Sequence, residues 1–476
     1  MIPAPPDERL PDGFVVRLAA GVRRRPDGAL LGGSPLRLLR LAPRARVLLG
    51  GDRLAVRDAM SAELAGRLLD AGLAVPVLPG RPADDVSVVI PVRDRPQGLA
   101  RLLTALRDDP ATAGLPVVVV DDGSVVPVVA GVRVLRHEVS RGPAAARNTG
   151  LLGAETPFVA FLDSDCVPRP GWLERLRPHL DDPRLAMVAP RIVALDERAA
   201  GWPAAYESAV SALDMGSDPA AVRPFSAVSY VPSAAVLARR AALGDGFDPS
   251  LRVAEDVDLV WRLAAAGWRV RYEPAAAVAH EHPARAGEWL RRRAFYGTGA
   301  ALLAARHGSA VAPVVLAPES GLAWALALFG GRRGRAAAGG LLAVTAVRLA
   351  RRLRRPGEPL PLRLAAGLVL RGQGASGRAL ARSVTRHHWP LALAAATVSG
   401  RARRRILAVA AADAVAAWWP HRHRVGPVRF VAGRRLDDLA YGAGLWWGAL
   451  RSRSPRALLP ARPPRLTDTK HTRRSE

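Results

Sequence analysis

The stretch VSVVIPVRDRPQGLARLLTALRDDPATAGLPVVVVDDGS, residues 86–124, contains two runs of apolar, mostly β-branched residues on either side of an amphipathic segment. Uninterrupted apolar runs of this length are typical of parallel strands that are covered on both faces. The intervening residues 96–109 repeat apolar side chains at helical spacing. A strand, a helix and a second strand within about 35 residues predict one βαβ unit.

The alternation of apolar runs and helical segments continues beyond this unit. Residues 141–154 predict a loop and a helix, residues 158–165 another strand, and residues 171–182 another helix. Strands that alternate with helices favour an α/β domain with a parallel sheet. In such a domain, ligands bind at the carboxyl ends of the strands.

Polar residues follow the predicted strands at the points where each one ends. A single Asp-Gly or Asp-x-Asp is common in loops, but a polar cluster after each of several buried strands predicts one binding site. The members of these clusters are Pro91, Arg93 and Asp94 after the first strand, Asp121 and Asp122 after the second, Arg147 in the next segment, and Asp163 and Asp165 after the strand at 158–162.

The chain resembles the family-2 glycosyltransferases in six motifs. They are VSVVIPVRDR (86–95), VVVVDDGS (117–124), RGPAAARNTG (141–150), FLDSD (161–165), AEDVDLVWRLAAAGW (254–268) and VAH (278–280). The resemblance implies the nucleotide-sugar fold called GT-A over residues 86–282. Longer stretches at 231–243, 246–263 and 291–308 resemble, more narrowly, the glycosyltransferases of the mycofactocin system. That likeness implies a UDP-sugar donor, UDP-glucose, and an acceptor that is a peptide-derived redox cofactor, mycofactocin or its precursor.

Glycosyl transfer releases a nucleoside diphosphate, whose growing negative charge a divalent cation can neutralise. Mg²⁺ and Mn²⁺ prefer carboxylate oxygens and leave positions for phosphate and water. Asp163 and Asp165 are spaced so that both can approach one cation. The family resemblance implies that Asp165 is the metal ligand, whereas Asp163, the second candidate ligand, contacts the ribose or a metal-bound water. The family resemblance adds His280 as a third ligand, with His282 as the alternative.

The nucleotide contacts follow from the resemblance. Asp122 matches the aspartate that accepts a hydrogen bond from the base, and Asp121 lies beside it. Arg147 is expected to contact the base or a phosphate. Pro91, Arg93 and Asp94 are expected to line the nucleotide pocket, although the family more often has Asn at the position of Asp94, which leaves the role of Asp94 open.

The segment VAEDVDLVWRL, residues 253–263, offers three carboxylates at the start of a predicted helix. Acidic residues also favour this position because of the helix dipole. The resemblance assigns Asp256 as the general base and Glu255 as a contact of acceptor or sugar hydroxyls. One base without a second nucleophilic carboxylate predicts a single displacement with inversion. Residues 288–297 lack the Gln-x-x-Arg-Trp motif of the family's processive polysaccharide synthases, which disfavours that activity.

The sequence predicts three domains. Residues 1–84 predict a small N-terminal unit, either winged-helix-like or a packing module without a ligand, and residues 85–300 the GT-A domain. Residues 301–476 predict a helical, apolar, Arg-rich region. Residues 331–476 hold 30 Lys and Arg residues against 6 Asp and Glu residues, within a total net charge of +27.

The basic C-terminal region predicts association with an anionic membrane surface. Its apolar stretches are short or interrupted compared with the roughly 20 residues of a spanning helix, so the presence of a span stays open. The start of the chain is acidic and proline-rich, unlike a signal peptide. The single cysteine, Cys166, excludes a disulfide framework. We therefore expect the catalytic domain in the cytoplasm, at the inner face of the cell membrane.

Two other activities compete with this interpretation. A transferase of the same fold could act on a membrane lipid or a cell-surface polysaccharide precursor. The Arg-rich region and the possible winged helix could instead belong to a nucleic-acid-binding protein. Carboxylates at the strand ends would repel phosphate without a metal, so we expect no nucleic-acid partner.

Overall fold

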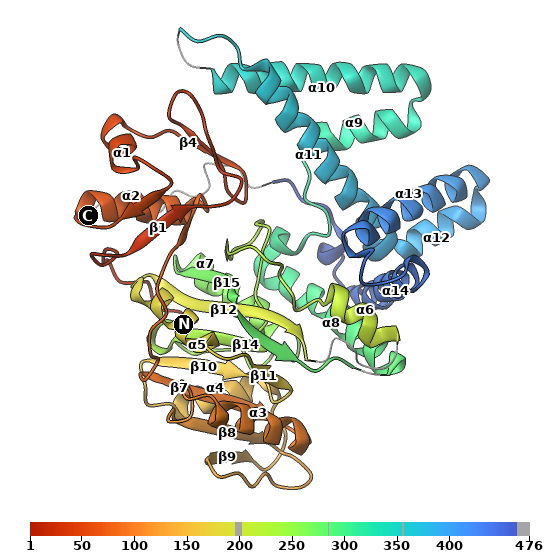
Figure 1. Cartoon of the computed structure of the whole chain (residues 1–476). Helices are drawn as coiled ribbons and strands as arrows, with labels where there is room; N and C mark the ends of the chain where they lie inside the picture. The colour runs from red at the N-terminus through yellow and green to blue at the C-terminus, as the bar shows by residue number, and fades with distance from the viewer. Residues whose placement is uncertain (196–201, 284, 355–356, 464–476) are drawn as a thin grey trace. The chain divides into compact units, whose positions relative to one another are not determined.

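The computed structural model describes residues 1–195, 202–283, 285–354 and 357–463 of a chain that divides into two compact units, residues 1–285 and 286–476 (Figure 1). The second unit begins with helix α8 (Ala286–His307), and the predicted boundary between residues 300 and 301 falls inside this helix. The three predicted domain ranges stay predictions.

The first unit opens with two small antiparallel sheets and two helices. One sheet has the order β5-β1-β6, and the other has the order β2-β3-β4. Helix α2 is capped by Asp58, the residue before it, whose carboxylate accepts the Ser61 backbone N–H at 2.7 Å. The helix buries Leu68 and Leu69 in a core shared with Phe14. The winged-helix likeness of this part stays a prediction. Its elements are β1 (Val15–Leu18), β2 (Arg23–Arg24), β3 (Leu30–Gly32), β4 (Arg37–Leu39), α1 (Pro43–Leu48), β5 (Arg53–Ala55), α2 (Ala59–Asp70) and β6 (Ala74–Pro76).

The large sheet of the first unit has nine strands in the order β11-β15-β12-β14-β10-β7-β8-β9, with β13 paired to β15 (Figure 1). The predicted βαβ unit is present as β7, α3 and β8. The strands are β7 (Val86–Val92), β8 (Val117–Asp122), β9 (Arg133–His137), β10 (Phe158–Leu162), β11 (Cys166–Pro168), β12 (Leu185–Ala194), β13 (Ala220–Ala221), β14 (Ala235–Arg239) and β15 (Arg269–His280).

The sheet is mixed, whereas the sequence predicted a parallel one. Strands β10, β7, β8 and β9 are parallel to one another. Strand β14 lies between β10 and β12 and is antiparallel to both. A buried strand is apolar on both faces whatever its direction, so the sequence pattern did not distinguish the two arrangements.

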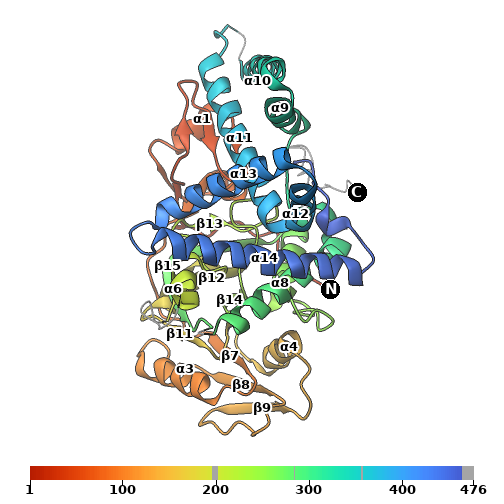
Figure 2. The same cartoon turned by 90° about the vertical axis from the view of Figure 1, so that its right-hand side faces the viewer.

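Helices cover both faces of the parallel part of the sheet, with α3 on one side and α4 on the other (Figure 2). Helix α4 lies so close to β7 that a Cβ atom added at Gly150 would lie 2.2 Å from Cγ1 of Val89. The helices of this domain are α3 (Pro96–Asp108), α4 (Pro143–Gly153), α5 (Trp172–Leu176), α6 (Trp202–Val210) and α7 (Glu255–Ala265).

The second unit is built from helices. The most extensive packing between its described helices is that of α8 against α14, which run side by side (Figure 2). Glycines allow this approach, since a Cβ atom added at Gly444 would lie 1.8 Å from the carbonyl oxygen of Ala294. After α8 the helices are α9 (Pro318–Phe329), α10 (Gly331–Leu353), α11 (Leu362–Arg382), α12 (Trp389–Val398), α13 (Gly400–Trp418) and α14 (Pro427–Arg451). Among the described residues, no helix combines the length and the apolar composition that crossing a bilayer requires.

A buried ion-pair network ties helix α2 to the large sheet. The Asp182 carboxylate is fully buried and accepts hydrogen bonds from Arg269, at 3.0 and 3.1 Å, and from Arg271. Burial raises the pKa of Asp182, but Arg271 and Arg269 outweigh it and hold the pKa below its usual value. Arg269 also donates to Asp70, at the end of α2, at 2.7 Å. Strand β15 is therefore fixed at its start by charge as well as by strand pairing.

We expect Asp182→Asn to lower the free energy of unfolding by about 3 kcal/mol, because it leaves the buried Arg271 guanidinium without its counter-charge and removes one of the two carboxylate partners of Arg269. Urea unfolding measures this loss. The matched control is Glu63→Gln, which removes an exposed i,i+4 partner of Arg67 and should cost about 0.3 kcal/mol. Equal effects of the two substitutions would show that the buried network does not hold the sheet.

Candidate active site

The polar clusters predicted from the sequence gather at one edge of the large sheet. The parallel register pairs Val92, at the end of β7, with Asp121, near the end of β8. Strand β10 runs parallel to β7 on the other side and ends at Leu162, directly before Asp163. Parallel strands bring their carboxyl ends to the same edge. The loops after β7, β8 and β10 therefore meet there.

Asp122 organises the loop before α4. Its two carboxylate oxygens accept hydrogen bonds from Ser140 Oγ and the backbone N–H of Arg141, both at 2.8 Å, and from the backbone N–H of Gly142 at 2.9 Å. Nδ1 of His137 lies 2.8 Å from the same carboxylate. Burial raises the pKa of Asp122, but the hydrogen bonds outweigh it and hold the pKa below its usual value. These four contacts occupy the roughly four acceptor positions of a carboxylate.

Asp121 and Asp94 shape the neighbouring loop. Asp121 accepts the backbone N–H of Ser124 at 2.9 Å. Asp94 has the left-handed φ of 53°, donates its own N–H to Ser124 Oγ at 3.0 Å, and accepts the N–H of Val125 at 2.8 Å. Arg93 reaches Ser140 Oγ at 3.0 Å. The structure thus brings Arg93, Asp94, Asp121 and Asp122 into one network of loops.

Pro91 lies one residue before the end of β7, paired with Val120 of β8 and half-buried. The predicted contacts of these five residues with a nucleotide stay predictions.

The turn after β10 carries Asp163 and Asp165. The N–H of Asp163 donates to the carbonyl of Ala234, and the N–H of Cys166 donates back to the carbonyl of Asp163, both at 2.9 Å. Helix α3 passes so close that a Cβ atom added at Gly98 would lie 2.6 Å from the carbonyl oxygen of Ser164. The turn is therefore held from two sides.

Asp165 and His280 meet because β11 pairs with the end of β15. The register places His280 opposite Cys166, and the N–H of Glu281 donates to the carbonyl of Asp165 at 3.0 Å. Nε2 of His280 lies 3.3 Å from Oδ1 of Asp165. That oxygen is buried and has no hydrogen-bond partner among the described residues. The other oxygen of Asp165 lies 3.2 Å from Arg95.

An unpaired carboxylate oxygen beside an imidazole nitrogen suits a shared cation. The described residues contain no group of three or more His, Cys, Asp or Glu side chains arranged to hold a metal. Asp163, the other predicted ligand, pairs with Arg147 at 2.6 Å. His282 lies with its ring centroid 5.7 Å from that of His280, and its Nδ1 is 4.0 Å from Glu207. Asp165 and His280 fit a cation that takes its remaining ligands from phosphate and water.

Helix α7 presents Glu255 and Asp256 at its first turn. Ala254, directly before the helix, has the left-handed φ of 62°, which is uncommon for a residue with a side chain. The oxygens of Asp256 accept the N–H of Val257 at 2.8 Å and, more weakly, the N–H of Ser233 at 3.4 Å. Burial and the neighbouring Glu255 raise the pKa of Asp256 to about 7. A carboxylate with this pKa is suited to take up a proton near neutral pH.

Arg147 joins the two groups of carboxylates. Its guanidinium donates to Asp163 at 2.6 Å and to Glu255 at 2.9 Å, and only 3% of the residue is exposed. The expected contact of Arg147 with base or phosphate stays a prediction. The sequence did not indicate these ion pairs, because Glu255 is 108 positions away. The pairing of Arg95 with Asp165 was also missed, although Arg95 lies in the first motif.

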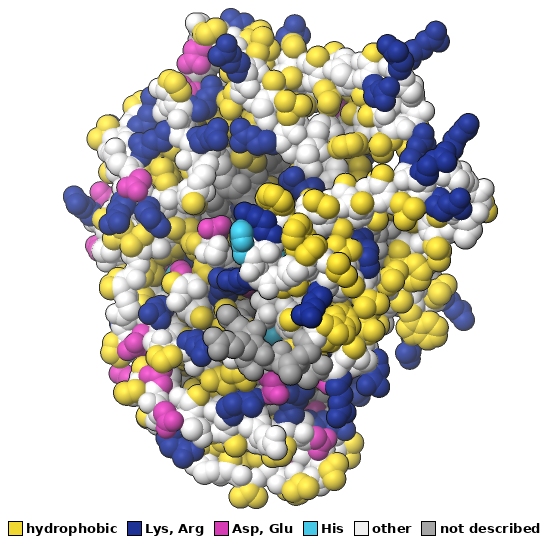
Figure 3. Space-filling view, turned by 45° about the vertical axis from the view of Figure 1, so that its right-hand side comes forward, with side chains coloured by type: hydrophobic (Ala, Val, Ile, Leu, Met, Phe, Trp, Pro, Cys, Tyr) yellow, Lys and Arg dark blue, Asp and Glu magenta, His cyan; other side chains and the backbone are white. Residues whose placement is uncertain are grey.

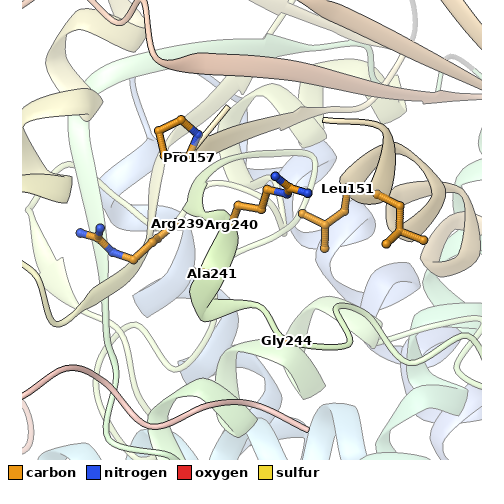
Figure 4. A pocket seen from close by; sticks show the side chains of 7 residues that line it. Leu151, Pro157, Arg239, Arg240, Ala241 and Gly244 are labelled. Carbon is orange, nitrogen blue, oxygen red and sulfur yellow. The ribbon is translucent and has the colours of Figure 1, made fainter. Parts of the chain in front are cut away.

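A pocket of about 470 Å³ lies elsewhere in the first unit (Figure 4). It lies at the other end of β10, since Arg239 pairs with Phe158, the first residue of that strand. The Arg239 guanidinium donates to the carbonyls of Leu180 and Asp182, so it has a structural role. The pocket is lined by Leu151, Leu152, Pro157, Arg239, Arg240, Ala241 and Gly244.

Comparisons with known proteins bear on the family of the chain. The family model described as glycosyl transferase family 2 matches residues 87–244. The pre-mycofactocin glycosyltransferases of two Mycobacterium tuberculosis strains, CDC 1551/Oshkosh and ATCC 25618/H37Rv, are 50% identical to the chain over 471 residues, which covers 95% of this chain and 98% of theirs. Among solved structures, a Pyrobaculum calidifontis mannosyltransferase in complex with GDP-Man and Mn²⁺ is 19% identical and has a TM-score of 0.38, covering 78% of this chain and 91% of that one.

The family model spans strands β7 to β14, so the α/β sheet described above is the GT-A-like fold of that family. With half of its residues identical to those of an enzyme of almost the same length, the chain belongs to the family-2 glycosyltransferases and is similar along nearly its whole length to the pre-mycofactocin glycosyltransferases.

Proposed function

We propose that the protein transfers a hexose, glucose from UDP-glucose, to a peptide-derived redox cofactor, premycofactocin or its precursor, with inversion at the anomeric carbon. The observation that carries the chemistry is the position of Asp256, a carboxylate with a pKa raised to about 7. Its neighbour Glu255 is joined to Asp163, in the turn after β10, because Arg147 pairs with both. The acceptor is supported by the 50% identity to enzymes named for premycofactocin.

The proposed reaction is a single displacement. The Asp256 carboxylate takes the proton of an acceptor hydroxyl as the acceptor oxygen attacks the anomeric carbon. The bond from that carbon to the phosphate oxygen breaks, and UDP leaves with the electron pair. Glu255 is held in place by Arg147 and has one oxygen left to orient a sugar or acceptor hydroxyl. No covalent glycosyl intermediate is needed, so the configuration inverts.

Asp165 and His280, with Asp163 beside them, are the residues that would hold Mg²⁺ or Mn²⁺. When bound, the cation supplies positive charge to the diphosphate leaving group. The Oδ1 atom of Asp165 is buried beside His280 and has no hydrogen-bond partner in the described part of the chain, which supports this part of the proposal. The remaining ligands would come from the donor diphosphate and water.

The reaction is tested by incubating the protein with UDP-glucose and premycofactocin and following the product by mass spectrometry. We expect hexose-spaced masses on the acceptor. Asp256→Asn should lower kcat by at least about a hundredfold, the contribution of a general base, while UDP binding by calorimetry is unchanged.

The deprotonated fraction of a carboxylate falls as pH falls, so wild-type activity should be lost below about pH 7. Full activity of Asp256→Asn would overturn the base assignment. Transfer to a membrane lipid or a polysaccharide precursor, with none to premycofactocin, would overturn the acceptor.

We expect Asp165→Asn and His280→Gln each to weaken Mn²⁺ binding at least about tenfold. Substitution of a residue that only supports a metal ligand already weakens binding by this factor, so loss of a ligand should cost at least as much. Electron paramagnetic resonance of free Mn²⁺, titrated with protein in the presence of UDP, measures it without activity. His282→Gln is the matched control, because it removes the neighbouring imidazole. A loss confined to His282→Gln would reassign the ligand, and no loss in any variant would refute the site.

We also propose that helices α12 and α13 bind an anionic membrane surface. Helix α12 has no buried residue among those described. The apolar side chains of these helices and of the turn after α13 that are more than half exposed include Leu391, Leu393, Val398, Leu407 and Trp419. Helix α13 begins with four exposed arginines, Arg401, Arg403, Arg404 and Arg405.

Exposed apolar and arginine side chains also alternate over the face of the molecule seen in Figure 3. Apolar side chains beside a cluster of arginines match the apolar interior and anionic head groups of a bilayer.

The protein should co-sediment with vesicles that contain phosphatidylglycerol and bind much less to phosphatidylcholine vesicles. Leu391→Ser with Leu393→Ser should reduce binding at least about tenfold, since two apolar anchors are lost. The matched control, Leu36→Ser with Val47→Ser, removes two exposed apolar side chains of the first unit and should leave binding unchanged. Failure of the wild-type protein to bind either vesicle refutes the proposed surface.

A further inference from the structure

Arg147 occupies a fixed place between two parts of the site that are far apart in sequence. One end of its guanidinium donates to Asp163, in the turn after β10, and the other end donates to Glu255, at the start of α7. The distances are 2.6 and 2.9 Å. Two charged partners at hydrogen-bond distance leave this buried group little freedom to swing toward a ligand.

The surroundings of Arg147 hold it in this place. Its guanidinium carbon lies 5.4 Å from the ring centroid of Phe247, and that ring packs edge-on against Phe161. The next residue, Asn148, accepts the N–H of Phe247 at 2.9 Å and donates to its carbonyl at 2.7 Å. Helix α4 is also pressed against β7 at Gly150. Arg147 is therefore positioned by the packing of the domain and does not need a ligand to order it.

The charge of Arg147 acts on Asp256 as well. Glu255, on the same helix, raises the pKa of Asp256, whereas Arg147, on α4, lowers it in part. Glu255 and Arg147 are the charged side chains with the largest effect on the pKa of Asp256, beside burial and the backbone N–H groups of Val257 and Ser233. Without Arg147, the buried negative charge of Glu255 would stand next to Asp256 uncompensated.

We propose that Arg147 is a positioning residue, which holds the Glu255–Asp256 end of α7 against Asp163 and does not contact the nucleotide. This inference rests on the proposed function of Asp256 as the base. It replaces the role expected from the sequence, where Arg147 was to contact the base or a phosphate. A planar guanidinium can pair with two carboxylates at once, whereas a lysine ammonium is a single point charge.

Two substitutions separate the charge of Arg147 from its geometry. Arg147→Gln removes the charge, and Arg147→Lys keeps the charge but lacks the planar fork. We expect Arg147→Gln to raise the pH at which kcat/KM reaches half of its maximum by about one unit, the effect of losing a nearby opposite charge. Arg147→Lys should keep this midpoint and lower kcat at least about tenfold, with the KM for UDP-glucose unchanged in both variants.

Arg177 supplies a matched control for burial and ion pairing. It is 5% exposed, donates to Asp85 at 2.6 and 2.7 Å and to Asp181 at 3.0 Å, and lies 4.2 Å from the ring centroid of Phe158. Phe158 begins β10, so this cluster lies at the opposite end of that strand from Asp163. Arg177→Gln should lower the unfolding temperature as Arg147→Gln does, but leave the pH midpoint and kcat unchanged.

Two measurements do not require activity, so they judge the inference even if the proposed reaction is wrong. The carboxyl ¹³C shift of Asp256, assigned with Asp256→Asn, should titrate about one pH unit higher in Arg147→Gln than in the wild-type protein. A crystal structure of the wild-type protein with UDP should keep the Arg147 guanidinium within hydrogen-bond distance of Glu255. Contact of Arg147 with uracil or phosphate, an increase in KM alone, or equal midpoints in Arg147→Gln and wild type would overturn the proposal.

Discussion

Repulsion between carboxylates is the constraint that the active-site edge of the sheet has to satisfy. Asp163 and Asp165 lie in the turn after β10, and Glu255 and Asp256 lie in the first turn of α7, so four carboxyl groups share a partly buried space. Arg147 pairs with one carboxylate of each segment, and Arg95 lies beside Asp165. Asp256 has no such partner, and burial raises its pKa. The carboxylates that pair with arginine therefore stabilise the structure, whereas Asp256, which does not pair with one among the described residues, can exchange a proton.

The two ends of β15 also differ in how completely a nearby carboxylate is paired. At its start, Arg269 and Arg271 fully neutralise Asp182, which keeps a lowered pKa and has no solvent contact. At its end, His280 lies beside an Asp165 oxygen without a hydrogen-bond partner among the described residues. A satisfied carboxylate stabilises the fold, whereas an unsatisfied one is available to a cation. Strand β15 thus runs from a carboxylate whose charge is neutralised by two arginines to a carboxylate oxygen that can still bind a cation.

Local sequence signals predicted the elements that depend on neighbouring residues. The βαβ unit, the strand before Asp163 and the acidic start of α7 follow from apolar runs and their ends, and the structure contains all three. The sequence predicted a parallel sheet, whereas β14 is antiparallel to both of its neighbours; an antiparallel strand buried on both faces has the same apolar pattern as a parallel one. The contact of Asp165 with His280 depends on the pairing of β11 with β15, which neither segment encodes alone. Only the family resemblance pointed to His280.

Two of the buried arginines of the first unit, Arg147 and Arg177, show why residue type and burial are not enough to assign a role. Arg147 and Arg177 are each paired with two carboxylates and lie over a phenylalanine ring. Arg177 joins Asp181 in its own turn to Asp85, just before β7, so it stabilises the base of the sheet. Arg147 joins a strand-end turn to the helix that carries Asp256. We therefore expect the ion pairs of Arg147, which join two segments of the active site, to affect the reaction. We expect the ion pairs of Arg177, which lie away from the active site, to affect stability alone.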